Sequence, residues 1–136
     1  MSLREQARQT LSFGAIGAIG FVVDGGILTL LYNLMDVALL PARLCSFAVA
    51  VTVTWSLNRR LTFPCAEDEQ ALRQWTRYAT VNGIGALLNL AIFLWLVNRF
   101  DVFAAFPLLP LAVASVIAMV FNFLASKYLA FRVARA

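Results

Sequence analysis

Polar side chains that could do chemistry lie inside stretches of this chain that are otherwise apolar. Asp24 stands in an apolar run over residues 11–32, with Gly14, Gly17 and Gly20 before it. Inside a bilayer a carboxylate costs roughly 2.5 to 3.5 kcal/mol on insertion scales, so it persists where it faces a partner, a cavity or a substrate. Asp24 is therefore the first candidate functional residue, through hydrogen bonds to a polar headgroup or through proton coupling.

A structural ion pair is a second explanation for Asp24. Arg43 lies near the start of the next apolar run, and its long side chain can reach inward along a neighbouring helix. A substrate can break a pair of this kind. The two explanations are therefore compatible.

Cations at the ends of apolar runs form another group of candidates. Arg59 and Lys127 follow Asn58 and Ser126, and an anionic headgroup would suit both, Arg as a bidentate fork and Lys as a point charge. Simple attraction to lipid phosphates explains such cations equally well, Arg60 above all. The candidate phosphate contacts are Arg59, Arg60, Arg77 and Lys127. The candidate substrate-binding residues are Asp24, Arg43, Thr54, Asn58, Arg59, Asn89, Asn122 and Lys127.

Several classes of protein are disfavoured. The chain has no histidine and two cysteines, Cys45 and Cys65, which are expected near opposite membrane faces, so we expect neither a metal site nor a disulfide. A single intramembrane acid without a second carboxylate is poorly suited to glycoside or phosphoryl chemistry. We therefore expect a protein that is not an enzyme and that has no cofactor.

Composition indicates a membrane protein. Of 136 residues, 62% are hydrophobic and 13% are charged, whereas soluble domains have about 25% charged residues. Four runs approach the roughly 20 apolar residues that span a bilayer, over residues 11–32, 42–58, 78–98 and about 107–126. The sequence predicts an all-α membrane protein, a single domain over residues 1–136 with four transmembrane helices. Residues 1–10 are expected on the membrane surface or disordered, and residues 65–76 as an amphipathic surface segment.

The distribution of positive charge predicts the orientation. Nine of the eleven basic residues precede the first run, lie between the second and third, or follow the fourth, and only Arg43 and Arg99 lie on the other side. By the positive-inside rule both termini are cytoplasmic. This explanation of the net charge leaves no need for a nucleic-acid partner.

The chain contains an internal duplication. With an offset of 65, Ile19-Gly20 aligns with Ile84-Gly85 and Asp24 with Asn89. With an offset of 68, Thr54 aligns with Asn122 and Arg59 with Lys127. The sequence thus predicts two tandem helical hairpins, residues 8–63 and 73–131, forming a parallel internal repeat. Substrate sites of transporters commonly lie at such repeat interfaces.

Several motifs together resemble the GtrA-like family of small four-span membrane proteins. They are FGAIG at residues 13–17, GFVVD at 20–24, LNRRLTF at 57–63, Arg77-Tyr78, VNGIG at 81–85, and Asn89. The positions that match the family pattern are Asp24, Asn58, Arg59, Thr62 and Phe63. The resemblance implies a flippase of the cytoplasmic membrane that moves a polyprenyl-phosphate-linked sugar, of the undecaprenyl type in bacteria, to the outer leaflet for surface polysaccharide synthesis. It also implies a partner membrane glycosyltransferase.

Elementary energetics agrees with that implication. A sugar phosphate crosses hydrocarbon only along a polar track, because each unsatisfied polar group costs several kcal/mol there. We expect a single wet passage from the cytoplasmic cations to Asp24, contact with membrane lipids, and a homodimer or complex, because four helices enclose little volume. Two alternatives remain open. One is a non-transporting anchor for the glycosyltransferase, and the other is a small proton-coupled multidrug exporter, whose cationic substrates would not be attracted by arginines.

Overall fold

The computed structural model describes residues 2–64, 70–106 and 108–132, and this part of the chain is helical throughout apart from short connections. The first hairpin consists of α1 (Leu3–Thr29), η1 (Leu30–Leu34), α2 (Leu39–Leu57) and η2 (Asn58–Thr62). The second consists of α3 (Ala71–Arg99), α4 (Asp101–Ala105), α5 (Leu108–Ala125) and η4 (Ser126–Ala130). Segments marked η are π-helical turns that continue the preceding α-helix.

Four helices are long and apolar enough to cross a membrane, which confirms the predicted number of spans. They cover Leu3–Leu34, Leu39–Thr62, Ala71–Arg99 and Leu108–Ala130, with mean hydropathies from 1.4 to 2.3. Each is longer than the sequence predicted, because polar residues extend the apolar runs as regular helix. A spanning helix needs only about 20 residues, so the extra turns can project beyond the hydrocarbon or accommodate tilt.

The two polar segments are helical where the structure describes them, so disorder as an expectation for residues 1–10 was wrong, while a position at the membrane surface stays a prediction for both. Residues 3–10 continue α1, whose start is closed by a capping box in which Ser2 Oγ accepts from the Glu5 amide at 3.3 Å and Glu5 Oε2 accepts from the Ser2 amide at 2.7 Å. Residues 71–76 form the first turns of α3. Residues 65–69, with Cys65, lie outside the described residues.

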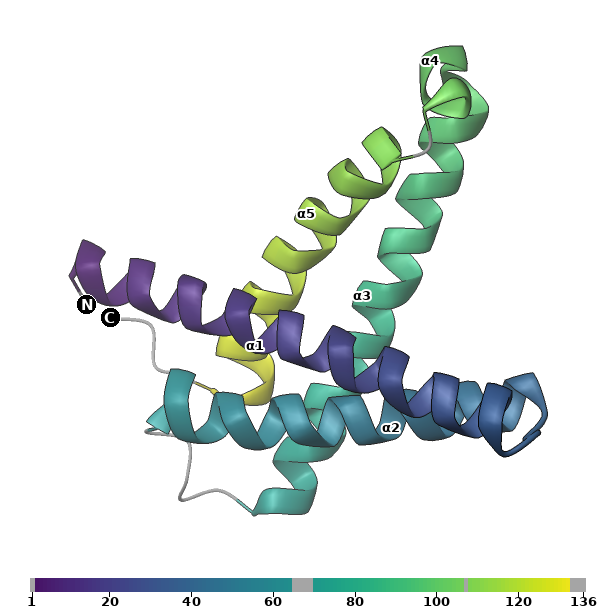
Figure 1. Ribbon diagram of the computed structural model, residues 1–136. Helices are drawn as coiled ribbons and strands as arrows, with labels where there is room; N and C mark the ends of the chain where they lie inside the picture. The colour runs from purple at the N-terminus through teal and green to yellow at the C-terminus, as the bar shows by residue number, and fades with distance from the viewer. Residues whose placement is uncertain (1, 65–69, 107, 133–136) are drawn as a thin grey trace.

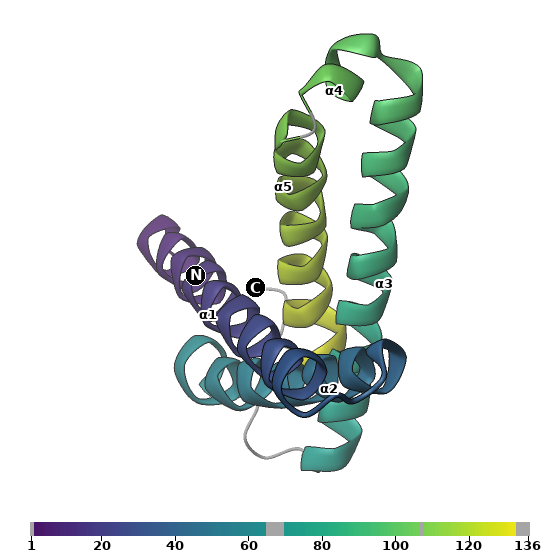
Figure 2. The ribbon, with the colours of Figure 1, turned by 45° about the vertical axis from the view of Figure 1, so that its right-hand side comes forward.

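The two hairpins cross steeply. α1 packs along α2, and α3 packs along α5, whereas contacts between the hairpins are confined to the crossing region. Figures 1 and 2 show that the connection from α1 to α2 and the α4 end of the second hairpin point away from each other. The hairpins therefore diverge from a shared centre toward their closed ends.

An aromatic cluster occupies that shared centre. Its buried members are Phe13, Val51, Phe63, Tyr78, Ala130 and Phe131. The rings of Phe63 and Phe131 lie 4.8 Å apart between centroids, and Phe13 lies 6.3 Å from Phe63. Because lipid tails are as apolar as these side chains, close packing and hydrogen bonds, rather than escape from water, hold the helices together.

Both hairpins end in a π-helical turn of five residues, and the turns are 68 residues apart. The Phe63 amide donates to the Asn58 carbonyl at 2.8 Å, and the Phe131 amide donates to the Ser126 carbonyl at 2.8 Å. π-helical turns are rare and occur often at functional sites. Here they place Phe63 and Phe131 in the aromatic cluster, a feature that hydropathy did not predict.

Candidate functional site: a polar cavity between the hairpins

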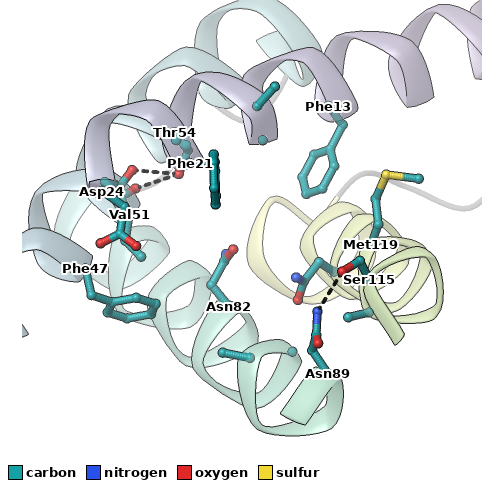
Figure 3. Close-up of a pocket in the computed structure, with 18 of the residues that line it drawn as sticks. Phe13, Phe21, Asp24, Phe47, Val51, Thr54, Asn82, Asn89, Ser115 and Met119 are labelled. Atoms are coloured by element: carbon teal, nitrogen blue, oxygen red, sulfur yellow. Dashed lines mark hydrogen bonds between the residues drawn. The ribbon is translucent and has the colours of Figure 1, made fainter. Parts of the chain in front are cut away.

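A cavity of about 420 Å³ lies between the two hairpins and is lined by residues from all four long helices (Figure 3). Six of the eight predicted substrate-binding residues line it: Asp24, Arg43, Thr54, Asn58, Asn89 and Asn122. Tyr78, Asn82 and Ser115 add further polar groups. Glycines and apolar side chains complete the wall. The cavity therefore brings polar groups from all four long helices together inside an apolar helical body, where such groups have to face one another or a ligand.

Asp24 and Arg43 form an ion pair where the cavity approaches the closed end of the first hairpin. Arg43 Nη1 lies 2.5 Å from Asp24 Oδ2, and the side chains of Arg43 and Asp24 are 51% and 19% exposed. Asp24 Oδ1 is buried and accepts no hydrogen bond from the described residues. The structure therefore contains the pair that sequence reasoning offered as an alternative, and it leaves one carboxylate oxygen able to accept a further hydrogen bond.

Amide side chains line the middle of the cavity. Asn89 Nδ2 donates to Ser115 Oγ at 3.3 Å and so connects α3 with α5, while Asn82 Nδ2 donates to the Tyr78 carbonyl at 2.9 Å. Figure 3 shows the end of the Asn82 side chain pointing from α3 into the space between the hairpins. Asn122 Oδ1 is buried without a partner among the described residues. These amides offer both donors and acceptors to a polar ligand.

A chain of hydrogen bonds closes the inner end of the cavity, which is the end that lies against the aromatic cluster. Asn58 Nδ2 donates to Tyr78 Oη at 3.0 Å, and Thr62 Oγ1 donates to Asn58 Oδ1 at 2.9 Å. The Thr62 hydroxyl also lies 2.8 Å from Ser12 Oγ. Asn58 is only 1% exposed. Two residues of the motif that resembles the GtrA-like family therefore tie α1, the end of α2 and α3 together.

The predicted phosphate-contact cations lie outside this cavity. Lys127 is 4% exposed, and its Nζ lies 5.8 Å and 5.5 Å from the ring centroids of Phe123 and Tyr128. Phe63 contacts both Phe123 and the cavity-lining Phe13. Aromatic rings thus lie between Lys127 and the cavity, so the structure does not show the expected single open passage.

Arg59 and Arg60 line a separate pocket of about 320 Å³ with Trp55 and Ser56. The Arg59 guanidinium lies 5.4 Å from the centroid of the Trp55 ring, at cation–π distance. Arg77 has a structural contact, because its Nη2 donates to the Ala130 carbonyl at 3.0 Å at the end of η4. Arg59 and Arg60 thus line one pocket, while Arg77 contacts the end of the π-helical turn that contains Lys127.

The two hairpins contain matching close contacts. A Cβ added at Gly20 would overlap the methyl group of Thr54, and a Cβ added at Gly85 would overlap the Asn122 amide. A larger residue at either place would have to displace a side chain of the second helix of the same hairpin, which lies close by. The cation–π contacts match as well, since Arg59 lies over Trp55 as Lys127 lies over Phe123, four residues earlier.

Several residues of the cavity and core were not predicted from the sequence. Asn82 and Ser115 are not among the predicted substrate-binding residues, yet both line the cavity. Tyr78 was noted only as part of the family motif, and Gln74, fully buried and accepting from Trp55 Nε1 at 3.1 Å, was not singled out. An amide at the edge of an apolar run was the available signal for Gln74. Among the described residues no group of three or more His, Cys, Asp or Glu could hold a metal ion.

Four apolar helices in two hairpins around a polar cavity define a multi-pass membrane protein with an intramembrane site. The family described as GtrA/DPMS, transmembrane domain, matches residues 12–133 of the sequence, and the chain belongs to this family. It is thereby placed among membrane proteins involved in handling lipid-linked sugars. A comparison with curated proteins gave no match.

Proposed function

We propose that this protein is a flippase that moves a polyprenyl-phosphate-linked sugar from the cytoplasmic to the outer leaflet of the cytoplasmic membrane. The observation that carries the proposal is the polar cavity of about 420 Å³ inside an apolar helical body, with lining from both hairpins. Such a cavity is large enough for a sugar phosphate and can replace the water that a headgroup loses in hydrocarbon. An inert membrane anchor has no need of it.

The charges suggest how a headgroup would lie. Arg43 is the one cation that lines the cavity in the described part of the chain, so it would bind the phosphate through its bidentate fork. Asp24 would then exchange its partner for sugar hydroxyls, which the amides of Asn82, Asn89 and Asn122 would also bind. Substrate would thus compete directly with the ion pair.

On this proposal the arrangement would correspond to a state that is open to the outer side. In the orientation given by the positive-inside rule, with both termini in the cytoplasm, the diverging closed ends of the hairpins face outward. The aromatic cluster and the bond between Asn58 and Tyr78 then close the cytoplasmic side. The pocket that contains Arg59 and Arg60 lies on that side and would capture the phosphate first.

A tandem duplication gives this protein a means of alternating access. The matching π-helical turns, glycine contacts and cation–π contacts at the offsets of 65 and 68 support two parallel repeats. Transporters with internal repeats alternate by rocking one repeat against the other around a central site. Here the aromatic rings that join the hairpins would have to separate for the cavity to open inward.

The remaining parts of the proposal concern chemistry and partners. The protein would act without a catalytic step, beside a membrane glycosyltransferase that makes the lipid-linked sugar. A homodimer would enclose the headgroup more completely than one steeply crossed pair of hairpins. The multidrug-exporter alternative is less favoured, because Arg43 lines the cavity that an apolar cation would have to enter.

Reconstitution tests the proposal. Purified protein is placed in liposomes with a short fluorescent polyprenyl-phosphate sugar, and the fraction accessible to a membrane-impermeant periodate or quencher is followed over time. We expect wild-type protein to raise the flipping rate at least tenfold over empty liposomes, and Asp24→Asn, Asn82→Leu and Arg59→Ala to lower it by a similar factor.

Asn98→Leu is the matched control for Asn82→Leu. Asn98 is exposed, lies outside the cavity and donates to the Leu94 carbonyl at 2.7 Å, so this variant loses the same groups without changing the site. Flipping by wild-type protein no faster than in empty liposomes would reject the flippase. Co-purification with a glycosyltransferase would then favour the anchor.

A further inference from the structure

A second cavity, of about 270 Å³, lies between α3 and α5 toward the closed end of the second hairpin. It adjoins the polar cavity, because Ala86 and Asn89 line both. The other lining residues are Leu90, Phe93, Leu108 and Leu111, so this groove is apolar. A polar and an apolar compartment thus meet at Asn89.

The first hairpin is bridged at the corresponding place. With the offsets of 65 and 68, Asp24 corresponds to Asn89 and Arg43 corresponds to Leu111. The ion pair between Asp24 and Arg43 therefore holds α1 to α2 where the second hairpin has an amide and a leucine. Asn89 bonds instead to Ser115, one turn farther from the closed end than Leu111.

This difference leaves room between the outer parts of α3 and α5. The apolar groove lies between these parts of the two helices, on the closed-end side of Asn89. The groove lies beyond the polar bridge between Asn89 and Ser115, on the side of the closed end of the hairpin. The second hairpin thus combines a cavity-lining amide, Asn89, with an adjoining apolar groove.

We propose that the groove between α3 and α5 is the lateral portal for the polyprenyl chain of the lipid-linked sugar. The inference rests on the proposed function for the identity of the headgroup. An amphiphile whose headgroup occupies the polar cavity must lead its tail out through an apolar opening, because neither part tolerates the other's surroundings. Asn89 stands at that junction.

The portal determines the route of the tail more than the strength of binding. An isoprenoid chain gains little by moving from lipid into a groove of Leu and Phe, since both are apolar, and the remaining gain is van der Waals contact with a shape that fits. A straight acyl chain would fit such a groove differently from a chain with regular methyl branches. An isoprenoid phosphate and a straight-chain alkyl phosphate should therefore compete differently for the groove.

Photolabelling tests the portal directly. Full-length protein in liposomes of phosphatidylethanolamine and phosphatidylglycerol is irradiated with farnesyl phosphate that carries a diazirine on its first isoprene unit, and labelled residues are mapped by mass spectrometry. We expect label on Leu90, Phe93, Leu108 and Leu111, reduced at least fivefold by excess undecaprenyl phosphate. Equal competition by hexadecyl phosphate would overturn the assignment to an isoprenoid. Label concentrated on Phe21 and Leu44 of the first hairpin would overturn the portal.

A filled groove gives an independent test. Leu111→Trp should lower both labelling and flipping at least tenfold, while the matched control Leu44→Trp, on an exposed part of α2, should leave both within twofold of wild type. Helical circular dichroism confirms that each variant is folded. If wild-type protein flips the sugar and Leu111→Trp flips it equally well, the portal is wrong and the flippase stands. If the groove is labelled and competed in a protein that does not flip, the flippase is wrong and the isoprenoid site stands.

Discussion

Asn58 and Tyr78 are joined by a hydrogen bond of 3.0 Å between Asn58 Nδ2 and Tyr78 Oη, and this bond ties the first hairpin to the second at the inner end of the cavity. Both side chains are almost fully buried. Thr62 Oγ1 donates to the side-chain oxygen of Asn58, Oδ1. The part of the sequence that most specifically resembles the GtrA-like family therefore closes the site, and it does so through a connected polar network.

Removal of the Tyr78 hydroxyl should destabilise the protein. Tyr78→Phe leaves the buried Asn58 amide without its acceptor, and we expect a loss of about 0.5 to 1.5 kcal/mol in the free energy of unfolding. Denaturant titration in detergent micelles measures it. Tyr32→Phe, at an exposed position in η1, is the control and should change the free energy by less than about 0.5 kcal/mol. Equal values for the two variants would contradict a structural role for the bond.

Gly20→Ala should lower stability because the new methyl group overlaps Thr54. Thr54 cannot turn away freely, since its hydroxyl donates to the Ala50 and Val51 carbonyls at 3.0 Å and 3.1 Å. We expect a loss of about 1 to 3 kcal/mol, measured by thermal unfolding. Gly17→Ala has open space around it and should be neutral or slightly stabilising.

The double variant Gly20→Ala, Thr54→Ser removes the overlapping methyl group and should recover most of the stability that Gly20→Ala loses. A double variant as unstable as the single one would show that the overlap with Thr54 is not the cause.

Gly85→Ala should separate stability from transport. Its methyl group would displace the Asn122 amide from its place in the cavity, whereas Gly83→Ala meets nothing. We expect Gly85→Ala to lower both the melting temperature and the flipping rate. With Asn122→Ala added, stability should return and flipping should stay low. Recovery of flipping in the double variant would exclude Asn122 from headgroup binding.

The ion pair of Asp24 and Arg43 should show energetic coupling. In a double-mutant cycle of Asp24→Asn and Arg43→Gln, we expect a coupling of at least about 0.5 kcal/mol in the unfolding free energy, because each single variant leaves one charge near the membrane interior without its partner. The double variant should be more stable than the less stable single variant yet inactive in flipping. If the double variant flips the lipid at the wild-type rate, the ion pair stabilises the fold and has no part in binding the headgroup.

Hydropathy was sufficient to predict which segments cross the membrane. Polar residues inside apolar runs, such as Asp24 and Asn89, then identified most of the polar residues that line the cavity, because a polar group in hydrocarbon has to face something. The long reach of an arginine side chain was enough to suggest Arg43 as the partner of Asp24. These inferences rest only on the free-energy cost of placing a polar side chain in lipid.

The faces of the helices were harder to predict. When a helix is apolar on every side, no periodic pattern shows which side meets its neighbours. Lys127 was therefore placed with the headgroup, although it lies buried against Phe123 and Tyr128. The π-helical turns, which place Phe63 and Phe131 in the aromatic cluster, and the steep crossing of the hairpins have no signal in the hydropathy pattern.

Cysteine accessibility tests the central claim most directly, namely that the headgroup occupies a water-filled cavity between the hairpins that is open to the outer side in this state. In a background with Cys45→Ser and Cys65→Ser, Ala86→Cys places a thiol in the cavity wall, and Ala48→Cys places one on an exposed part of α2 that does not line the cavity. A membrane-impermeant maleimide is applied to the outer face of intact cells or oriented vesicles. We predict that the thiol at position 86 reacts, that the thiol at position 48 does not, and that a polyprenyl-phosphate sugar slows the reaction at position 86 at least fivefold. A thiol at position 86 that is unreactive from outside, or that reacts at the same rate with and without the lipid-linked sugar, would contradict the account.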